Sequence, residues 1–233
     1  MKRIEKKSRV ETRKHKAVRR TLLCLAAVTV FSALHLYTFT PMQAVRQAEG
    51  QMGTGTTSLI RRMNGDKWDQ IYYLTANEHA ILVTRLDFHL LYGWFGLPMH
   101  TIDCSDLGDF QAKATMGWTS DEGVARWTIF GRLQSQEVTG IQAQFRFEYR
   151  DEKTGGYVEL PEITVSDISE FTTARDGRRY FIAQGVISGV EHGEYGSGLY
   201  PLEMAAATLD AQGNILAQYR QTDYNMEMIS EEE

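Results

Sequence analysis

From Trp68 onward, hydrophobic side chains recur at every second residue, and this alternation limits most of the chain to β structure. The plainest stretch is GIQAQFRFEYR, residues 140–150. Successive side chains of a strand point to opposite faces. One face of this stretch would carry Ile141, Ala143, Phe145, Phe147 and Tyr149, and the other Gln142, Gln144, Arg146, Glu148 and Arg150. The pattern predicts a strand with one buried face.

Turn residues divide the other alternating runs into pairs. The pairs are DQIYYLT with AILVTRLDF, FQAKATMGW with VARWTIFGRL, GIQAQFRFEYR with YVELPEITV, EFTTA with RRYFIAQGVI, and LEMAAATLD with NILAQYRQ. Asp176-Gly177 suits a two-residue hairpin turn, and Pro161 predicts an edge strand or a bulge. Hairpins without intervening helices favour antiparallel sheets. We therefore predict a mainly β domain over residues 68–224, an antiparallel, immunoglobulin-like β-sandwich without the disulfide, followed by a frayed acidic tail, residues 225–233.

Charge is distributed unevenly along the chain. Residues 1–40 hold ten Lys and Arg against two Glu, whereas residues 41–233 hold 15 Lys and Arg against 28 Asp and Glu. Polyphosphate would be repelled by an acidic domain, so nucleic acid is not expected as its partner.

An uncharged stretch of twenty residues, Thr21–Thr40, follows the basic N-terminal tail. About 20 helical residues cross a hydrocarbon core of about 30 Å. A cleaved signal peptide is the rival interpretation, but no small-x-small cleavage site stands out before Val45. The stretch therefore predicts one uncleaved transmembrane helix at residues 21–40, with the membrane as a partner.

Positive charge stays on the cytoplasmic side of a membrane. This rule places the basic tail, residues 1–20, inside, and residues 41–233 outside, as a single-pass protein of the cell membrane. Residues 41–67 read as a juxtamembrane helix and stalk. Pro41 suits a helix start, glycines 50, 53 and 55 would end the helix, and TTSLIRRMNGD would add one helical turn.

Residues able to perform chemistry are few. Cys104 lies near His100 in HTIDC, but a lone cysteine without a family motif is more often inert. The acidic loops at Asp103, Asp106 and Asp109, and at Asp121 and Glu122, lack the EF-hand pattern for calcium. We therefore expect no catalytic residue and no cofactor.

The loop EHGEYGSG offers one weak candidate metal site, formed by Glu191, His192 and Glu194. One histidine and two carboxylates can hold zinc when a loop brings them together, although no H-E-x-x-H motif is present. A splayed surface loop that holds no metal is the competing interpretation.

FHLLYGWFGLP, residues 88–98, contains more aromatic surface than one strand face needs. Its aromatic residues are Phe88, Tyr92, Trp94 and Phe95. If exposed, they would form an interaction patch. If buried, they would fill one end of the sandwich.

The arrangement of a basic tail, one apolar segment and an alternating domain resembles uncharacterised single-pass, membrane-anchored β-sandwich proteins of Gram-positive clostridial bacteria. IFGRLQSQEVTGIQAQF is similar to a strand–turn–strand segment of their surface domains. The resemblance implies an envelope location and carries no functional residue.

These features together predict a membrane-anchored, extracytoplasmic binding or structural domain. It would bind an unknown envelope protein or a glycan, with no enzymatic activity. The alternatives are a cell-envelope hydrolase, with His192 and Glu194 or His100 and Cys104 at its site, and a metal-binding sensor domain.

Overall fold

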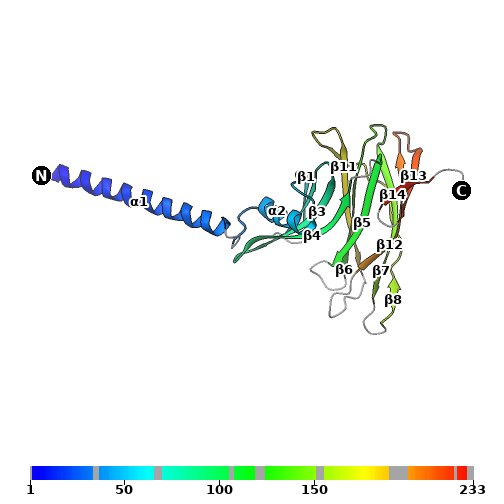
Figure 1. Ribbon diagram of the computed structural model, residues 1–233, viewed down its shortest axis with the longest axis horizontal. Helices are drawn as coiled ribbons and strands as arrows, with labels where there is room; N and C mark the ends of the chain where they lie inside the picture. The colour runs from blue at the N-terminus through cyan, green and yellow to red at the C-terminus, as the bar shows by residue number, and fades with distance from the viewer. Residues whose placement is uncertain are drawn as a thin grey trace.

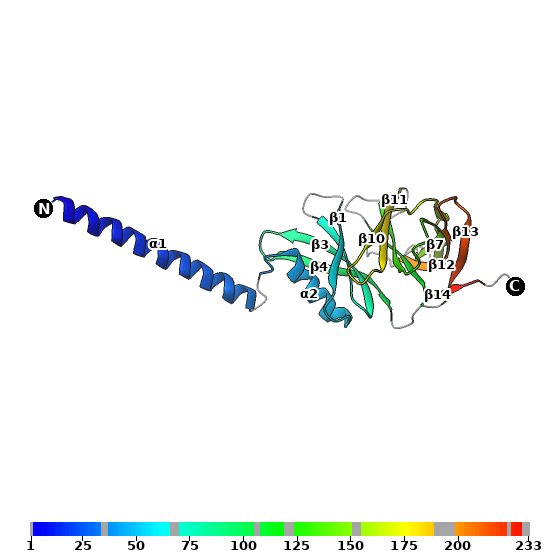
Figure 2. The same ribbon diagram turned by 90° about the horizontal axis from the view of Figure 1, so that it is seen from above.

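The computed structural model describes residues 2–33, 37–65, 70–104, 108–118, 124–150, 155–188, 199–222 and 225–229. Two helices precede the strands. Helix α1, Lys2–Ala33, extends away from the strands, and helix α2, Pro41–Met52, lies against them (Figures 1 and 2). The fold is mainly β, as the alternation predicts.

The strands form three sheets, and neighbouring strands within each sheet are antiparallel. The first sheet has the order β1–β2–β3–β4, with β1 Ser58–Asn64, β2 Gln70–Ala76, β3 Ala80–His89 and β4 Gly93–Asp103. The second has the order β10–β11–β6–β5, with β5 Phe110–Trp118, β6 Val124–Leu133, β10 Phe171–Thr173 and β11 Arg179–Ser188. The third has the order β14–β13–β12–β7–β8, and β9 also pairs with β7; its bounds are β7 Gly140–Arg150, β8 Tyr157–Glu159, β9 Ile163–Val165, β12 Leu199–Leu209, β13 Ile215–Thr222 and β14 Asn225–Met228.

All five predicted strand pairs are present, and the segment predicted to pair with β7 does so as the two short strands β8 and β9. The pairs β2–β3, β5–β6, β10–β11 and β12–β13 each join strands that follow one another in sequence. Gly177 has a φ of 80° in the turn between β10 and β11, a backbone conformation that favours glycine. Pro161 falls between the short strands β8 and β9, where the chain interrupts its pairing with β7, in agreement with the predicted irregularity.

Three segments differ from the sequence prediction. Residues 58–64, expected as a helical turn, form strand β1 along the edge of the first sheet. The aromatic stretch continues into β4, for which no strand was predicted. Residues 225–228, expected to be frayed, form β14 and pair with β13. In each case pairing with a neighbouring strand decides the structure, and pairing leaves little signal in a short local sequence.

Helix α2 begins and ends at residues with capping geometry. The side chain of Thr40 accepts a hydrogen bond from the backbone N–H of Gln43, and the Thr40 N–H donates to the side-chain oxygen of Gln43. Pro41 occupies the first turn, where its missing N–H costs nothing. Gly53, with a φ of 67°, ends the helix in the left-handed conformation, as the glycine-rich sequence predicts.

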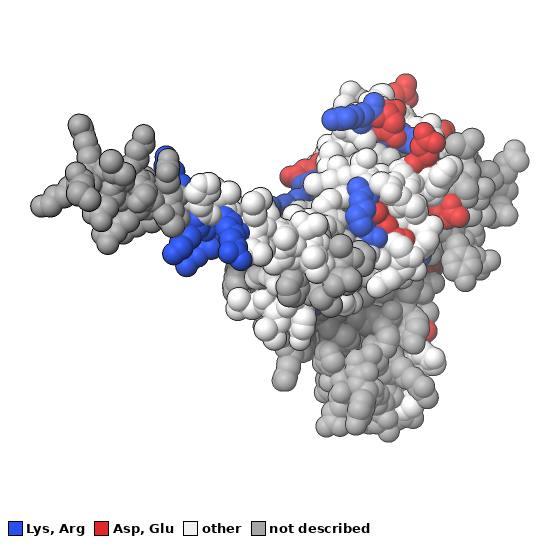
Figure 3. All heavy atoms as spheres, turned by 60° about the vertical axis from the view of Figure 1, so that its left-hand side comes forward, with Lys and Arg blue, Asp and Glu red and all other residues white. Residues whose placement is uncertain are grey.

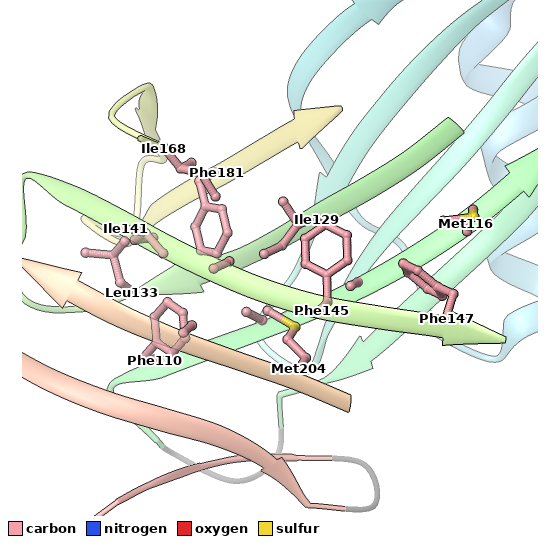
Figure 4. Packing of buried hydrophobic residues seen from close by; sticks show 14 of the residues in the cluster. Phe110, Met116, Ile129, Leu133, Ile141, Phe145, Phe147, Ile168, Phe181 and Met204 are labelled. Atoms are coloured by element: carbon pink, nitrogen blue, oxygen red, sulfur yellow. The ribbon is translucent and has the colours of Figure 1, made fainter. Parts of the chain in front are cut away.

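Three buried clusters connect these elements. The largest is shared by the second and third sheets, and Figure 4 shows it from close by. Its members include Phe110, Ile129, Leu133, Phe145, Phe147, Phe181 and Met204. A second cluster joins the first and second sheets, and a third joins α2 to the first sheet. The second sheet therefore contributes side chains to buried clusters from both of its faces.

The prediction of a membrane anchor at residues 21–40 is wrong. Among the described residues, no helix combines the length and the apolar character needed to cross a membrane. Within α1 the uncharged part runs from Thr21 to Ala33, about 20 Å at about 1.5 Å per residue. Farther along, Thr38 bridges to Gly93 and Thr40 caps α2, so these residues belong to the folded part. The predicted single-pass, extracytoplasmic placement depended on the anchor and is withdrawn with it.

Replacement of Phe145 tests the cluster between the second and third sheets. Phe145 is 2% exposed and makes edge-on ring contacts with Trp127 and Phe147. We expect Phe145→Ala to lower the free energy of unfolding by about 3–5 kcal/mol, because it removes the ring and leaves a cavity. The neighbouring exposed residue provides the control: Gln144→Ala should change the free energy of unfolding by less than about 0.5 kcal/mol. Urea unfolding monitored by circular dichroism measures this free energy for both variants. Equal decreases in the two variants would contradict the packing of Phe145.

Candidate binding surface

The aromatic stretch forms the hairpin between β3 and β4 in the first sheet. Residues 90–92 make the loop, and β4 starts at Gly93 with a φ of 78°. Strand register places Phe88 opposite Trp94 and His89 opposite Gly93. The tip of this hairpin lies beside the junction of α1 and α2 (Figures 1 and 2).

The loop exposes three consecutive hydrophobic side chains. Leu90 is 88% exposed, Leu91 is 77% exposed and Tyr92 is 61% exposed. Phe39 and Phe95 are also exposed. We call Phe39, Leu90, Leu91, Tyr92 and Phe95 the tip surface. Single exposed hydrophobic residues are normal on proteins, whereas adjacent ones mark interaction surfaces.

The four aromatic residues singled out in the sequence divide into two kinds. Tyr92 and Phe95 are exposed. Phe88 and Trp94 are half-buried and pack on each other, with ring centroids 5.3 Å apart. Trp94 also packs against the cluster that joins α2 to the first sheet. One pair is therefore available to a partner, while the other supports the hairpin.

A short segment, residues 37–39, holds the base of the tip in place. The N–H of Thr38 donates to the carbonyl of Tyr92 at 2.9 Å, and the N–H of Trp94 donates to the carbonyl of Thr38 at 2.8 Å. The rings of Tyr37 and Phe39 contact each other with centroids 4.7 Å apart. These contacts satisfy part of the open edge of β4.

The tip surface has no formal charge of its own. Residues 88–102 contain no Lys, Arg, Asp or Glu. His89, also exposed, lies with its ring 5.9 Å from that of Tyr92. Figure 3 shows the charges of one face: basic side chains gather on the described part of α1, and both signs are mixed over part of the strand region. An uncharged surface of this kind favours contact with apolar groups.

Sequence reasoning identified this stretch but missed its most exposed members. Leu90 and Leu91 are aliphatic and were not singled out with the aromatic residues. The signal that could have found them is the run of fifteen uncharged residues, 88–102, because a hairpin tip within such a run has no charge to place in solvent. Phe39 is distant in sequence, and no local pattern brings it to the hairpin.

The other candidate sites receive no support from the structure. Glu191, His192 and Glu194 lie outside the described residues, as do Asp106, Asp121 and Glu122. Within the described ranges, no group of three His, Cys, Asp or Glu side chains is placed to hold a metal ion.

The pair of Cys104 and His100 lies at the first sheet, with Cys104 2% exposed. Burial raises the pKa of the Cys104 thiol to about 11, although the nearby guanidinium of Arg132 opposes the increase. Burial, together with the charge of Lys113, lowers the pKa of His100 to about 4. At neutral pH both side chains are therefore uncharged, which disfavours a thiolate nucleophile.

Comparisons with protein-family models, with curated proteins and with solved structures find no match to this chain. The resemblance to clostridial envelope proteins is therefore untested.

Thiol labelling tests the environment of the two cysteines. Cys24 is exposed and Cys104 is buried. At pH 8 we expect Ellman's reagent to modify one thiol per folded chain and two per chain in 8 M urea, because burial and the raised pKa protect Cys104. The variant Cys24→Ser should show no fast-reacting thiol when folded. Rapid labelling of that variant in native buffer would contradict the buried position.

Replacement of Gly93 tests the attachment of residues 37–39. A Cβ at Gly93 would lie 2.0 Å from the carbonyl oxygen of Thr38, and its φ of 78° disfavours L side chains. We expect Gly93→Ala to displace the segment and to lower the free energy of unfolding by about 2–3 kcal/mol.

Gly177 provides a matched control, since its φ is 80° but no atom lies within 4 Å of the added Cβ. Gly177→Ala should lower the free energy of unfolding by about 1 kcal/mol, because it adds backbone strain but no steric clash. Hydrogen exchange of the Trp94 amide should accelerate in Gly93→Ala alone. If the two substitutions changed the free energy of unfolding and the exchange of the Trp94 amide equally, residues 37–39 would not contribute to the stability of the hairpin.

Proposed function

We propose that this chain is a non-catalytic binding domain that recognises another protein through the tip surface. The single observation that carries the proposal is the exposure of Leu90, Leu91 and Tyr92 in one hairpin loop. Exposing such a row to water is unfavourable, and covering it with an apolar pocket contributes about 25 cal/mol for each Å² buried. A folded scaffold that holds these residues outward is suited to an interface.

A protein fits this surface better than a glycan does. Sugars are bound mainly through hydrogen-bonding side chains, whereas the tip surface consists of two leucines, two phenylalanines and one tyrosine, and residues 88–102 contain no charged residue. Tyrosine is enriched at protein interfaces because its ring buries a large area and its hydroxyl can donate a hydrogen bond. The expected partner therefore presents an apolar pocket with a polar rim.

The remaining strands would act as the support for this hairpin. In this proposal the second and third sheets form the predicted β-sandwich through their shared cluster, and the first sheet extends from it to present the tip. The segment 37–39 would fix the orientation of the hairpin, so that less conformational entropy is lost on binding.

Site-specific photocrosslinking tests the proposed surface. A benzophenone amino acid at position 91 in the full chain, expressed in its native host, should give one discrete adduct with a second protein. Leu216, exposed on β13, is the matched control position and should give none. The double substitution of Leu90 and Tyr92 by Ser should abolish the adduct at position 91. It should change the free energy of unfolding by less than about 1 kcal/mol, because both side chains are exposed.

Two outcomes would contradict the proposal. An adduct of equal yield at position 216 would show that labelling does not depend on the hairpin. An adduct of twice the chain mass, with dimers in analytical ultracentrifugation, would make the partner a second copy of this chain rather than another protein.

A further inference from the structure

A trough of about 210 Å³ lies on the face of the third sheet that is turned away from the large buried cluster. Successive side chains of a strand point to opposite faces of the sheet. Phe145 of β7 and Met204 of β12 point into the cluster, as Figure 4 shows. Their neighbours Gln144 and Ala205 therefore point to the other face, where both line the trough. The tip surface belongs to the first sheet, so the two features are separate.

Strand register gives the trough its shape. Ala207 on β12 lies opposite Gln142 on β7 and opposite Gln218 on β13. Neighbouring strands lie about 4.8 Å apart, so the backbones of these two glutamines are about 10 Å apart, with only a methyl group between them. Ala205 repeats the arrangement two residues earlier, with Gln144 opposite it on β7. Small side chains of β12 thus form the floor, and glutamines form the walls.

The walls carry hydrogen-bonding groups that are available to a ligand. We call Gln142, Gln144 and Gln218 the wall glutamines. All three are exposed, and within the part of the chain that the structure describes their side-chain amides make no hydrogen bond. Thr164 on β9, opposite Gln144, adds an exposed hydroxyl. An amide side chain both donates and accepts hydrogen bonds, and so does a hydroxyl, so the trough can pair with several neutral polar groups.

The trough is uncharged although the surrounding chain is acidic. None of the described residues that line it is Lys, Arg, Asp or Glu, whereas residues 41–233 hold 28 Asp and Glu against 15 Lys and Arg. Beyond one end, Arg146 donates to Glu203. Arg220, opposite Ala205 on β13, also acts on Glu203 electrostatically. An uncharged lining of amides matches an uncharged polar ligand, because no charge has to be removed from water when the ligand binds.

We propose that this trough binds a neutral glycan, whose hydroxyl groups pair with the wall glutamines and whose C–H groups rest on Ala205 and Ala207. Sugar hydroxyls donate and accept hydrogen bonds as the amides do, so the match requires no charge. An extended peptide fits less well, because its backbone pairs with the edge of a sheet, whereas the backbone groups below this face already pair between strands. The trough and the tip surface therefore take ligands of different chemistry.

The size of the trough limits the contact. Pockets for drug-sized molecules measure about 300–1,000 Å³, and this trough is smaller. A neighbouring space of about 100 Å³ shares Gln144 and Ala205 with it, so the ligand can continue beyond one end. Tyr219 contributes no ring for stacking, because its ring packs on that of Phe110 with centroids 4.6 Å apart. We therefore expect weak binding, with a dissociation constant on the order of 1 mM.

NMR titration of the full chain tests the proposal. The neutral probes are cellotetraose, maltotetraose and chitotetraose, each at about 10 mM, tenfold above the expected dissociation constant. At least one of them should shift the side-chain amide resonances of the wall glutamines. Tetragalacturonate, the acidic comparison, should bind at least about tenfold more weakly, because the domain is acidic and the trough offers no cation.

Gln142→Ala and Gln218→Ala should each weaken the binding of the neutral probe about two- to tenfold, because the net contribution of one hydrogen bond is modest. Gln212→Ala is the matched control and should leave the binding unchanged. Gln212 is an exposed glutamine of the turn between β12 and β13 and does not line the trough.

Ala207→Gln separates the space in the trough from its hydrogen-bonding capacity. The substitution adds an amide but fills the floor, so it should weaken the binding at least about tenfold. Ala211→Gln, at an exposed position of the same turn as Gln212, is its control and should have no effect. Unchanged or tighter binding by Ala207→Gln would contradict the proposed position of the glycan.

Three results with the unmodified chain would overturn the proposal, and they do not depend on the folding of any variant. The first is the absence of shifts in the wall glutamines with all three neutral probes. The second is equal binding of tetragalacturonate. The third is a concentration-dependent shift of the same amides without sugar, together with dimers in analytical ultracentrifugation, which would assign this face to a second copy of the chain.

Discussion

The burial of β6 on both faces is the constraint on which the rest of the structure depends. Ala125, Ile129 and Leu133 are at most 1% exposed and belong to the cluster with the third sheet. Phe130 is fully buried in the cluster with the first sheet. Position 131 requires glycine, because a Cβ at Gly131 would lie 2.0 Å from the carbonyl oxygen of Gln111 on β5. A strand covered in this way is held by packing on both sides, and the other two sheets take their positions from it.

The interface between the first and second sheets is apolar in its middle and polar on either side. The middle closes over Phe130 and Ile182, which lie opposite each other on β6 and β11. On one side, Gln184 donates from Nε2 to the hydroxyl of Thr128 at 3.1 Å. On the other side, buried Arg132, opposite Tyr180, donates to the carbonyl of Cys104 at 3.2 Å, while its Nε and Nη1 have no hydrogen-bond partner among the described residues. Long polar side chains pack less completely than branched aliphatic ones, so this interface can contain both a sealed core and a small cavity.

The sequence predicts those parts of the fold that are determined by residues close together in the chain. Alternation identifies β7 because its two faces have different surroundings, and Asp176-Gly177 identifies a turn because only certain residues tolerate its backbone angles. The assignment of β1 fails because SLIRRMN places two arginines side by side and has no alternating face. The length of the apolar helix is overestimated because residues 37–40 leave it for contacts with a hairpin more than fifty residues away, which no local window contains.

The same distinction separates the tip surface from the cavity of about 210 Å³ between the first and second sheets. The tip surface comes mainly from one uncharged stretch, so the sequence indicates where to look for it. Residues of five strands line the cavity, and the local sequence around each of them gives no sign of it. Arg85 is a member of an ion pair, and Arg126 occupies a polar position of an alternating strand.

The pairing of β3 with β4 connects the tip surface with the interface between the first and second sheets. Strand register places Asp87 opposite Phe95 of the tip surface and Arg85 opposite Leu97 of the cavity lining. A register shift between Val83 and Thr84 lies opposite residues 98–100 of β4. Because the hairpin tip is the continuation of the same two strands, its orientation depends on how firmly their base is held.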